Sequence, residues 1–252
     1  MERKTVLVSG ATSGIGKAAA QRFSSEGYNL IITGRRKDRL DNVEKELKSS
    51  GVSVVSLCFD IRNRQEVISS IDSLAPEWKK IDILVNNAGL AVGLSHIQDG
   101  DADDWERMID TNFKGLLWLT RAVAPLMVER GKGHIINISS IAGKEVYENG
   151  NVYCASKSAV EALSKTMRID LLSHNIKVTN VAPGMVETEF SLVRFKGDTD
   201  KASTPYKGLK PLTANDVADV IYYCASLPEH VNINDIVVMP TAQAGANNVF
   251  RK

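Results

Sequence analysis

The sequence contains few cysteines and shows no metal-binding pattern. Its three cysteines, Cys58, Cys154 and Cys224, are widely separated and odd in number. This argues against a framework of disulfide bonds and indicates a reducing compartment. The four histidines lack the spacing of metal ligands. We therefore expect a cytoplasmic protein without a bound metal.

Long apolar runs and an excess of charge are also absent. No segment approaches the roughly 20 apolar residues that a membrane span requires, and the apolar run before Gly10 is too short for a signal peptide. The 31 basic and 30 acidic residues leave a net charge of +1, so no general attraction to nucleic acid or to an anionic membrane is expected. These absences favour a soluble protein whose partner is a small molecule.

The sequence does contain a regular alternation of β-branched and amphipathic segments. Seven β-branched runs predict buried parallel strands, at Thr5–Ser9, Leu30–Thr33, Val52–Phe59, Ile81–Val85, His134–Ile138, Ile176–Val181 and Asp235–Met239. The intervening segments predict helices, at Ile15–Glu26, Lys37–Lys48, Arg64–Leu74, Asp103–Glu129, Val152–Leu172 and Ala214–Ser226. This alternation predicts a single α/β domain over residues 1–252, with a Rossmann-like, doubly wound parallel sheet of about seven strands and helices on both faces.

The segment 188–211 interrupts the alternation. It contains Gly197, Pro205, Gly208 and Pro211 together with many charged residues. These residues disfavour a long helix or strand, so we expect a long loop that acts as a substrate lid.

A glycine-rich turn follows the first predicted strand. Doubly wound sheets bind ligands at the carboxyl ends of their strands. The spacing G-x-x-x-G-x-G would let the backbone approach a pyrophosphate, and the next helix would offer free N–H groups. A tight strand–helix turn is the alternative, but the position in the first βαβ unit favours a dinucleotide. We expect cofactor contacts from Gly10, Thr12, Ser13, Gly14, Ile15 and Gly16.

The second strand ends without a carboxylate that could hold a ribose 2′-hydroxyl. Residues 30–36 contain no Asp or Glu and end in Arg35 and Arg36. Guanidinium groups suit a 2′-phosphate. A solvated arginine pair at a helix start is the alternative. The pattern predicts NADP as the cofactor, bound in preference to NAD.

Two further strand ends carry candidate cofactor contacts. Asp60 and Ile61 follow the third strand, where a carboxylate can accept a hydrogen bond from the adenine amino group. Residues 86–89 follow the fourth strand, where the small side chains near Asn87, Ala88 and Gly89 leave room for a ribose. Asn86 itself can equally be structural and tie neighbouring strands together.

Tyr153 and Lys157 are four residues apart on a predicted helix and therefore share a face. A nearby ammonium favours the phenolate and should lower the phenol pKa from its ordinary value near 10. The tyrosine could then exchange the alcohol proton while a hydride moves, with Ser140 hydrogen-bonded to the substrate oxygen. Tyr206 and Lys210 have the same spacing, but glycine and proline surround them, so we interpret that pair as accidental.

In their order along the chain these motifs resemble the short-chain dehydrogenase/reductase family, over essentially the whole sequence. The resemblance rests on the glycine turn, on Asn86-Asn87-Ala88-Gly89, Asp110-Thr111-Asn112, Ser140-Ile141-Ala142-Gly143, Tyr153-Cys154-Ala155-Ser156-Lys157 and Pro183-Gly184-Met185-Val186-Glu187-Thr188. It implies a catalytic tetrad of Asn112, Ser140, Tyr153 and Lys157, in which the asparagine bends its helix and holds a water beside the lysine. It also implies cofactor contacts from Tyr153, Lys157, Pro183, Gly184, Val186 and Thr188. One departure is Ser9, where the family usually has threonine; the hydroxyl is retained.

A narrower resemblance is to the NADP-dependent 3-hydroxy acid dehydrogenases of this family, which act on serine, allo-threonine and related acids. It rests on Asn151-Val152-Tyr153, on segments 193–198 and 227–234, and on Met239-Pro240. The resemblance implies a homotetramer, and we expect the tail Gln243–Lys252 to pack at a subunit interface. A substrate carboxylate needs a cation, for which Arg194 and Lys196 are candidates. A solvated loop or an intersubunit salt bridge is the alternative for both.

Three functions are compatible with these residues. The first is a dehydrogenase of 3-hydroxy acids such as serine, allo-threonine or 3-hydroxyisobutyrate. The second is an NADPH-dependent carbonyl reductase of broader range, acting on ketones, aldehydes or dicarbonyls. The third is a non-catalytic, NADP-binding regulatory protein, which fold alone never excludes. The presence of Asn112, Ser140, Tyr153 and Lys157 argues against the third, because a pure binder does not need the tyrosine hydroxyl.

Overall fold

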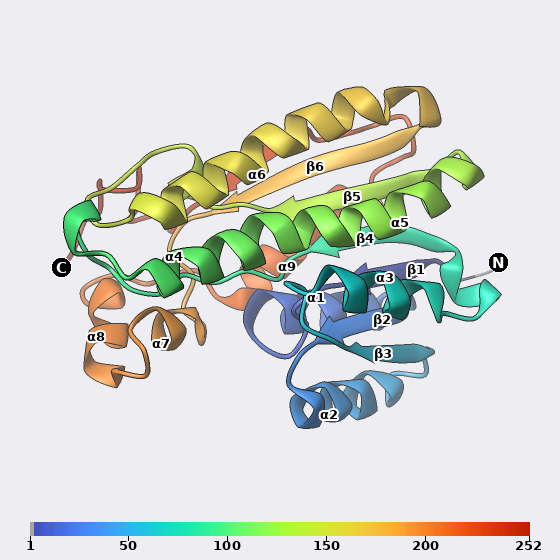
Figure 1. The fold of residues 1–252 in the computed structure, drawn as a ribbon, viewed down its shortest axis with the longest axis horizontal. Helices are drawn as coiled ribbons and strands as arrows, with labels where there is room; N and C mark the ends of the chain where they lie inside the picture. Colours follow the sequence, from blue (N-terminus) through green and yellow to red (C-terminus); the bar gives the residue numbers. More distant parts are fainter. Residues whose placement is uncertain (1–2) are drawn as a thin grey trace.

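The computed structural model describes residues 3–252, and within them seven parallel strands form one sheet (Figure 1). The strands are β1 (Thr5–Val8), β2 (Asn29–Gly34), β3 (Val54–Cys58), β4 (Ile81–Asn86), β5 (Gly133–Ile138), β6 (Ile176–Pro183) and β7 (Asp235–Val238). Their order is β3-β2-β1-β4-β5-β6-β7. The order reverses between β1 and β4, so the carboxyl ends of these two strands form the switch point at which such sheets bind ligands. The predicted fold class is confirmed.

Helices cover both faces of the sheet. The longer ones are α1 (Gly14–Ser25), α2 (Lys37–Lys48), α3 (Arg64–Asp72), α4 (Ala102–Ile109), α5 (Leu116–Arg130), α6 (Asn151–Asp170) and α9 (Ala214–Ser226). The short ones are α7 (Phe190–Arg194), α8 (Thr199–Ser203), η1 (Pro76–Lys79), η2 (Ile97–Asp99), η4 (Ile141–Gly143), η5 (Leu172–His174) and η6 (Thr204–Tyr206). In Figure 1, α5 and α6 lie in front of the sheet and α9 lies behind it. No helix within residues 3–252 has the length and apolar character that crossing a bilayer requires.

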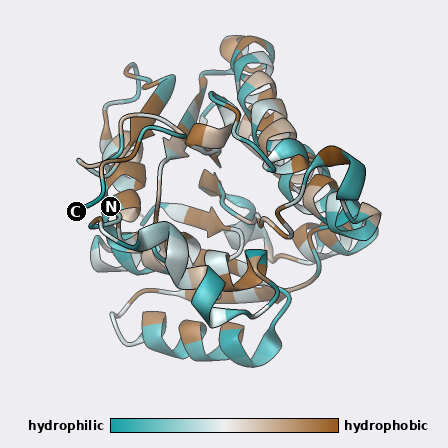
Figure 2. Ribbon diagram, turned by 90° about the vertical axis from the view of Figure 1, so that its left-hand side faces the viewer, coloured by the Kyte–Doolittle hydropathy of each residue, from teal (hydrophilic) through white to brown (hydrophobic). Residues whose placement is uncertain are grey.

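The strand side chains alternate between two hydrophobic cores. Val6 and Val8 of β1 pack with α1, α2 and α9, whereas Leu7 packs on the opposite face with α3, α5 and α6. All three are fully buried. Figure 2 shows the hydrophobic strands at the centre and the more hydrophilic helices at the periphery. A β-branched run buried on both faces is what distinguishes these strands in the sequence.

The helix predicted over Asp103–Glu129 is not a uniform α-helix. A π-helical segment, η3 (Asp110–Gly115), separates α4 from α5. Such a segment inserts extra chain into a helix and shifts the side chains that follow. Tertiary contacts surround it: a Cβ on Gly115 would lie 2.9 Å from Ile61 Cγ2, and Asn112 is hydrogen-bonded to Leu90.

The expectation of a long loop over 188–211 is also wrong in its secondary structure. The segment folds into α7, α8 and η6, which lie at the lower left of Figure 1. It is held by side-chain contacts. The Tyr206 hydroxyl donates to the Val186 carbonyl at 2.9 Å and is hydrogen-bonded to Ser191 Oγ at 2.6 Å.

Candidate active site

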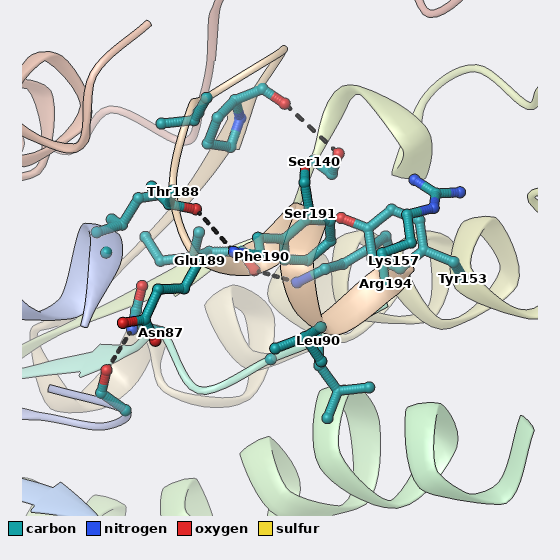
Figure 3. A pocket seen from close by; sticks show the side chains of 18 of the residues that line it. Asn87, Leu90, Ser140, Tyr153, Lys157, Thr188, Glu189, Phe190, Ser191 and Arg194 are labelled. Carbon is teal, nitrogen blue, oxygen red and sulfur yellow. Dashed lines mark hydrogen bonds between the residues drawn. The ribbon is translucent and has the colours of Figure 1, made fainter. Parts of the chain in front are cut away.

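A cavity of about 530 Å³ opens at the carboxyl ends of the central strands. Its walls come from the turns after β1, β2, β3, β4 and β5, from the start of α6, and from the chain between β6 and η6. Figure 3 shows Tyr153, Lys157 and Arg194 on one side of this cavity and Asn87 and Glu189 on the other. The topology therefore brings together residues as far apart in the sequence as Gly10 and Asn247, at the place where the sheet order predicts a ligand.

The glycine turn after β1 forms one wall. Gly10 has φ +66°, and a Cβ there would lie 2.9 Å from Ala88 Cα. Five of the six residues predicted in this turn line the cavity, namely Gly10, Thr12, Ser13, Gly14 and Ile15. Gly16 does not; a Cβ on it would lie 2.3 Å from Asn87 Nδ2, so it permits close packing behind the turn. Ser13, the N-cap of α1, makes no capping side-chain bond within the described chain, which leaves N–H groups of the helix for an anion.

The hydroxyl of Ser9 ties this turn to the one after β4. Ser9 Oγ accepts hydrogen bonds from the backbone N–H groups of Asn87 and Ala88, both at 3.0 Å. Asn87 Nδ2 in turn donates to the Ser9 carbonyl at 2.9 Å. Serine therefore provides the brace for which the family usually has threonine. Asn87, Ala88 and Gly89, which we expect to contact the cofactor, all line the cavity.

Asn86 has the structural role that was one of its two interpretations. Its side chain is buried and donates to Thr120 Oγ1 and to Asn137 Oδ1, both at 2.9 Å. It ties β4 to β5 and to α5 and is not part of the cavity wall.

The arginines after β2 line the cavity but have different partners. Arg36 Nη2 donates to Thr12 Oγ1 and Ser13 Oγ, both at 3.0 Å. Arg35 lies 3.8 Å from the Asp60 carboxylate, which accepts closer hydrogen bonds from Arg62. Asp60 and Ile61 line the cavity too. Arg36 is thus the arginine that shares an anion-binding corner with the glycine turn.

A carboxylate that we did not anticipate occupies this corner. Glu189 accepts from Arg39 Nη1 at 2.7 and 2.8 Å and from Arg36 Nη1 at 3.2 Å. Desolvation acts to raise the pKa of Glu189, but the hydrogen bonds from Arg39 and Arg36 outweigh it and keep that pKa below its ordinary value. The group is therefore an anion at neutral pH.

Tyr153 and Lys157 lie on one face of α6, and both are buried. Lys157 Nζ donates to the Ile138 carbonyl at the end of β5, at 2.9 Å. Ser140 begins the η4 turn after that strand; its Oγ accepts from Ala142 N at 3.1 Å. Tyr153, Lys157 and Ser140 all line the cavity, so the structure brings together the three side chains that the sequence suggested for proton transfer.

The expected electrostatic effect of Lys157 on Tyr153 is wrong for this structure. Burial raises the pKa of Tyr153 well above its ordinary value, and Tyr147 adds to the rise. A hydrogen bond from Ser140 and the charge of Arg194 oppose it, so Arg194, rather than Lys157, is the cation that lowers this pKa. Burial also lowers the pKa of Lys157 itself to about 8. Spacing alone predicted that the two residues share a face but not the cost of desolvation.

Asn112 lies behind Lys157 rather than in the cavity wall. Its Oδ1 accepts from Leu90 N and its Nδ2 donates to Leu90 O, both at 2.8 Å. A Cβ on Gly89 would lie 3.3 Å from both Asn112 Oδ1 and Lys157 Nζ. The asparagine belongs to the π-helical segment, and its side chain fixes the backbone after β4 next to the lysine.

Arg194 reaches the cavity, whereas Lys196 does not. Arg194 Nη2 donates to the Tyr147 hydroxyl at 2.8 Å, and its guanidinium lies 5.5 Å from the ring centre of Tyr153. Its Nε is buried and has no hydrogen-bond partner within residues 3–252. Lys196 is exposed and paired with Asp104 at 2.7 Å, as the alternative of a charged, solvated loop predicts for it.

The chain after β6 completes the wall. Pro183, Gly184, Val186 and Thr188, for which the family resemblance implies cofactor contacts, line the cavity. The tail Gln243–Lys252 also takes part, because Gln243 and Asn247 lie in the wall. Gln243 Oε1 accepts from Met185 N at 2.8 Å.

Sequence reasoning missed several wall residues. Tyr147, Phe190 and Gln243 line the cavity, and the Phe190 ring packs edge-on at 5.6 Å from that of Tyr153. Tyr147 and Gln243 stand in irregular segments and Phe190 begins the five-residue helix α7, so no periodicity marks which side chains point inward. Only the contacts made in the fold reveal them: Tyr147 with Arg194, Phe190 with Tyr153, and Gln243 with Met185.

Comparisons with known proteins agree with this geometry. The model of the short chain dehydrogenase family matches residues 4–197. The NADP-dependent 3-hydroxy acid dehydrogenase YdfG of Salmonella typhi is 48% identical over 242 residues, 96% of each chain. Sulfoacetaldehyde reductase 2 of Chromohalobacter salexigens is 48% identical over 240 residues, 95% of each chain. The closed form of a serine dehydrogenase complexed with NADP+ has a TM-score of 0.92 at 47% identity and covers 98% of this chain and 100% of that one. The chain therefore belongs to the short chain dehydrogenase family.

Proposed function

We propose that the protein is an NADP-dependent oxidoreductase that transfers a hydride between the nicotinamide and the 3-hydroxyl or 3-keto carbon of small hydroxy acids. Candidate substrates are serine, allo-threonine and 3-hydroxyisobutyrate. The observation that carries the proposal is the position of Arg194: its guanidinium and the phenol of Tyr153 lie side by side in one cavity. An anion held by Arg194 would place a nearby hydroxyl at the proton-exchanging group.

The residues of the wall fit NADP. The uncapped start of α1 suits the pyrophosphate, and the corner formed by Arg36, Thr12 and Ser13 suits the 2′-phosphate. When bound, the cofactor supplies or accepts the hydride. We assign further contacts to the wall residues predicted from the sequence, including Asp60, Ile61, Val186 and Thr188.

The chain's own residues handle the proton. In the reducing direction the protonated phenol of Tyr153 donates its proton to the carbonyl oxygen, and Ser140 donates a hydrogen bond to that same oxygen. In the oxidising direction the phenol first passes its proton to neutral Lys157 and then takes the proton of the alcohol; the pKa of Lys157, about 8, lets the amine accept and return this proton near neutrality. Asn112 positions Lys157 through the backbone at Leu90.

The cofactor corner predicts a loss of selectivity in Arg36→Ala. The variant should bind NADPH about 10- to 100-fold more weakly, because a charged hydrogen-bond partner of the phosphate is gone. Its Kd for NADH should change by less than about twofold. Fluorescence titration of both nucleotides measures the effect, with the neighbouring exposed residue in Lys37→Ala as the control. A wild-type protein that binds NADH as tightly as NADPH would contradict the assignment.

The substrate corner predicts a defect confined to anionic substrates in Arg194→Ala. Its KM for 3-hydroxyisobutyrate should rise about 10- to 100-fold, because the carboxylate loses its cation. Its KM for an uncharged secondary alcohol should stay within about twofold. Lys196→Ala is the matched control, since Lys196 is paired with Asp104 outside the wall. Equal effects of Arg194→Ala on both substrates would rule out a carboxylate contact.

A carbonyl reductase acting on an anionic aldehyde is the second candidate. Sulfoacetaldehyde reductase 2 is as similar to this chain as the hydroxy acid dehydrogenase. A sulfonate would engage the same arginine as a carboxylate. Comparing kcat/KM for sulfoacetaldehyde reduction with that for serine and 3-hydroxyisobutyrate oxidation, at equal enzyme concentration, separates the two.

We further propose that the protein is one domain, with 188–211 as the substrate lid, and that it works as a cytoplasmic homotetramer. Both hydrophobic cores share the one sheet. Ile169 near the end of α6 and Leu172 at the start of η5 are each 73% exposed, which suits an interface between copies. The three cysteines are unpaired, as a reducing compartment favours. Light scattering coupled to size-exclusion chromatography tests the assembly.

A further inference from the structure

Two arginines and two hydroxyls surround the carboxylate of Glu189 at the adenosine end of the cavity. Arg39 and Arg36 bind it directly, and Arg36 also holds the hydroxyls of Thr12 and Ser13. Converging guanidinium and hydroxyl donors form the donor set of a phosphate. The structure thus shows an anion-binding corner in which the chain's own carboxylate is the anion.

The ion pairs that hold Glu189 are exchangeable. The side chains of Arg36, Arg39 and Glu189 are 40%, 48% and 42% exposed. Ion pairs at such exposure contribute little to stability, because water and salt screen them. A phosphate carries close to two negative charges at neutral pH and offers three acceptor oxygens. It would therefore outcompete a single carboxylate for the same guanidinium groups.

Glu189 also connects the two ends of the cavity. It directly precedes α7, which carries Phe190 and Arg194 against Tyr153. Its partners Arg36 and Arg39 lie at the start of α2. Figure 3 shows Glu189 beside Phe190 in the same wall. One residue thus links the two arginines to α7.

We propose that Glu189 is an internal competitor for the cofactor's 2′-phosphate, and that its displacement both sets the NADPH affinity and releases α7 from α2. The proposal rests on the assignment of NADP as cofactor. Exchange of the Glu189 carboxylate for the 2′-phosphate couples the nucleotide site to the substrate site. By linkage, a substrate that binds better when α7 is released also strengthens the binding of NADPH. Glu189 acts here as a specificity-determining residue, since NADH has no phosphate with which to displace it.

The binding test compares Glu189→Gln with wild type. The variant keeps the side-chain volume but removes the competing charge, so its Kd for NADPH should fall about fivefold. Its Kd for NADH should stay within about twofold. Glu187→Gln is the matched control: it removes the same charge two residues earlier from an exposed side chain outside the wall. Weaker NADPH binding by Glu189→Gln, or equal changes for both nucleotides, would overturn the proposal.

The release of α7 has its own readout in hydrogen exchange. In wild type, 2′,5′-ADP should increase amide exchange over residues 190–203 relative to 5′-AMP, which lacks the 2′-phosphate. In Glu189→Gln the two nucleotides should give the same exchange, since nothing remains to be displaced. Indistinguishable exchange with the two nucleotides in wild type would refute the coupling.

The two assignments fail in different ways. If wild type prefers NADH to NADPH, the cofactor assignment is wrong. If wild type prefers NADPH while Glu189→Gln leaves both Kd values unchanged, only the role of Glu189 is wrong.

Discussion

Replacing Tyr153 by phenylalanine should lower kcat by about 10³-fold or more, while the Kd for NADPH stays within about twofold. The substitution deletes one hydroxyl from a ring that is buried and already packed against Phe190. The fold and the cofactor wall should therefore survive, and only proton exchange should be lost. Nicotinamide absorbance during oxidation of 3-hydroxyisobutyrate gives kcat, and fluorescence titration gives the Kd.

Tyr223→Phe is the matched control, because Tyr223 is 56% exposed on α9 and removal of its hydroxyl leaves the cavity intact. Normal turnover by Tyr153→Phe would show that another group exchanges the proton. If the wild type turns over and Tyr153→Phe binds NADPH without activity, the hypothesis of a non-catalytic NADP-binding protein is also excluded.

Lys157→Met should be both inactive and more stable than wild type at pH 7. Burial lowers the pKa of Lys157 from 10.5 to about 8, a shift worth about 3.5 kcal/mol at ~1.4 kcal/mol per unit. Methionine fills the site without this cost but loses the hydrogen bond that the charged amine donates to Ile138, worth about 1.5–3 kcal/mol. We expect a net gain of about 0.5–2 kcal/mol in the free energy of unfolding, and a fall in kcat of about 100-fold or more.

The stability gain should depend on pH in a defined direction. Between pH 8 and 10.5 the unfolded chain keeps the Lys157 proton that the folded chain has lost, so wild type gains stability as the pH rises through this window. The advantage of Lys157→Met should therefore shrink between pH 7.5 and 10. Urea unfolding at several pH values measures it, and Lys165→Met, on the exposed side of α6, is the control. A variant that is less stable than wild type at pH 7 would contradict the role of desolvation.

The fold could be predicted because the sheet is buried on both faces, so each strand appears in the sequence as a short run of apolar, often β-branched residues. Val6, Leu7 and Val8 show it most simply, with successive side chains in opposite cores. The π-helical segment could not be predicted, because its register depends on contacts made far away in the chain, such as that between Gly115 and Ile61. Local propensity does not encode such contacts.

At the site, the sequence predicted where the side chains lie better than it predicted their pKa values. The four-residue spacing placed Tyr153 and Lys157 on one face of α6, but spacing carries no information about desolvation. Arg194 and Lys196 are only two residues apart, and local pattern could not rank them. The fold decides between them, since Arg194 meets Tyr147 in the wall and Lys196 meets Asp104 outside it.

The two halves of the cavity are built from different kinds of chain. Strand ends and the first turns of long helices form the nucleotide half, so changes there would disturb the sheet. The short helices after β6 and the tail that carries Gln243 form much of the substrate half, and such irregular surface segments accept new side chains at little cost to the fold. A scaffold divided in this way can change its substrate while the residues that bind the cofactor stay the same. This gives a physical reason why two relatives equally similar to this chain are named a hydroxy acid dehydrogenase and a sulfoacetaldehyde reductase.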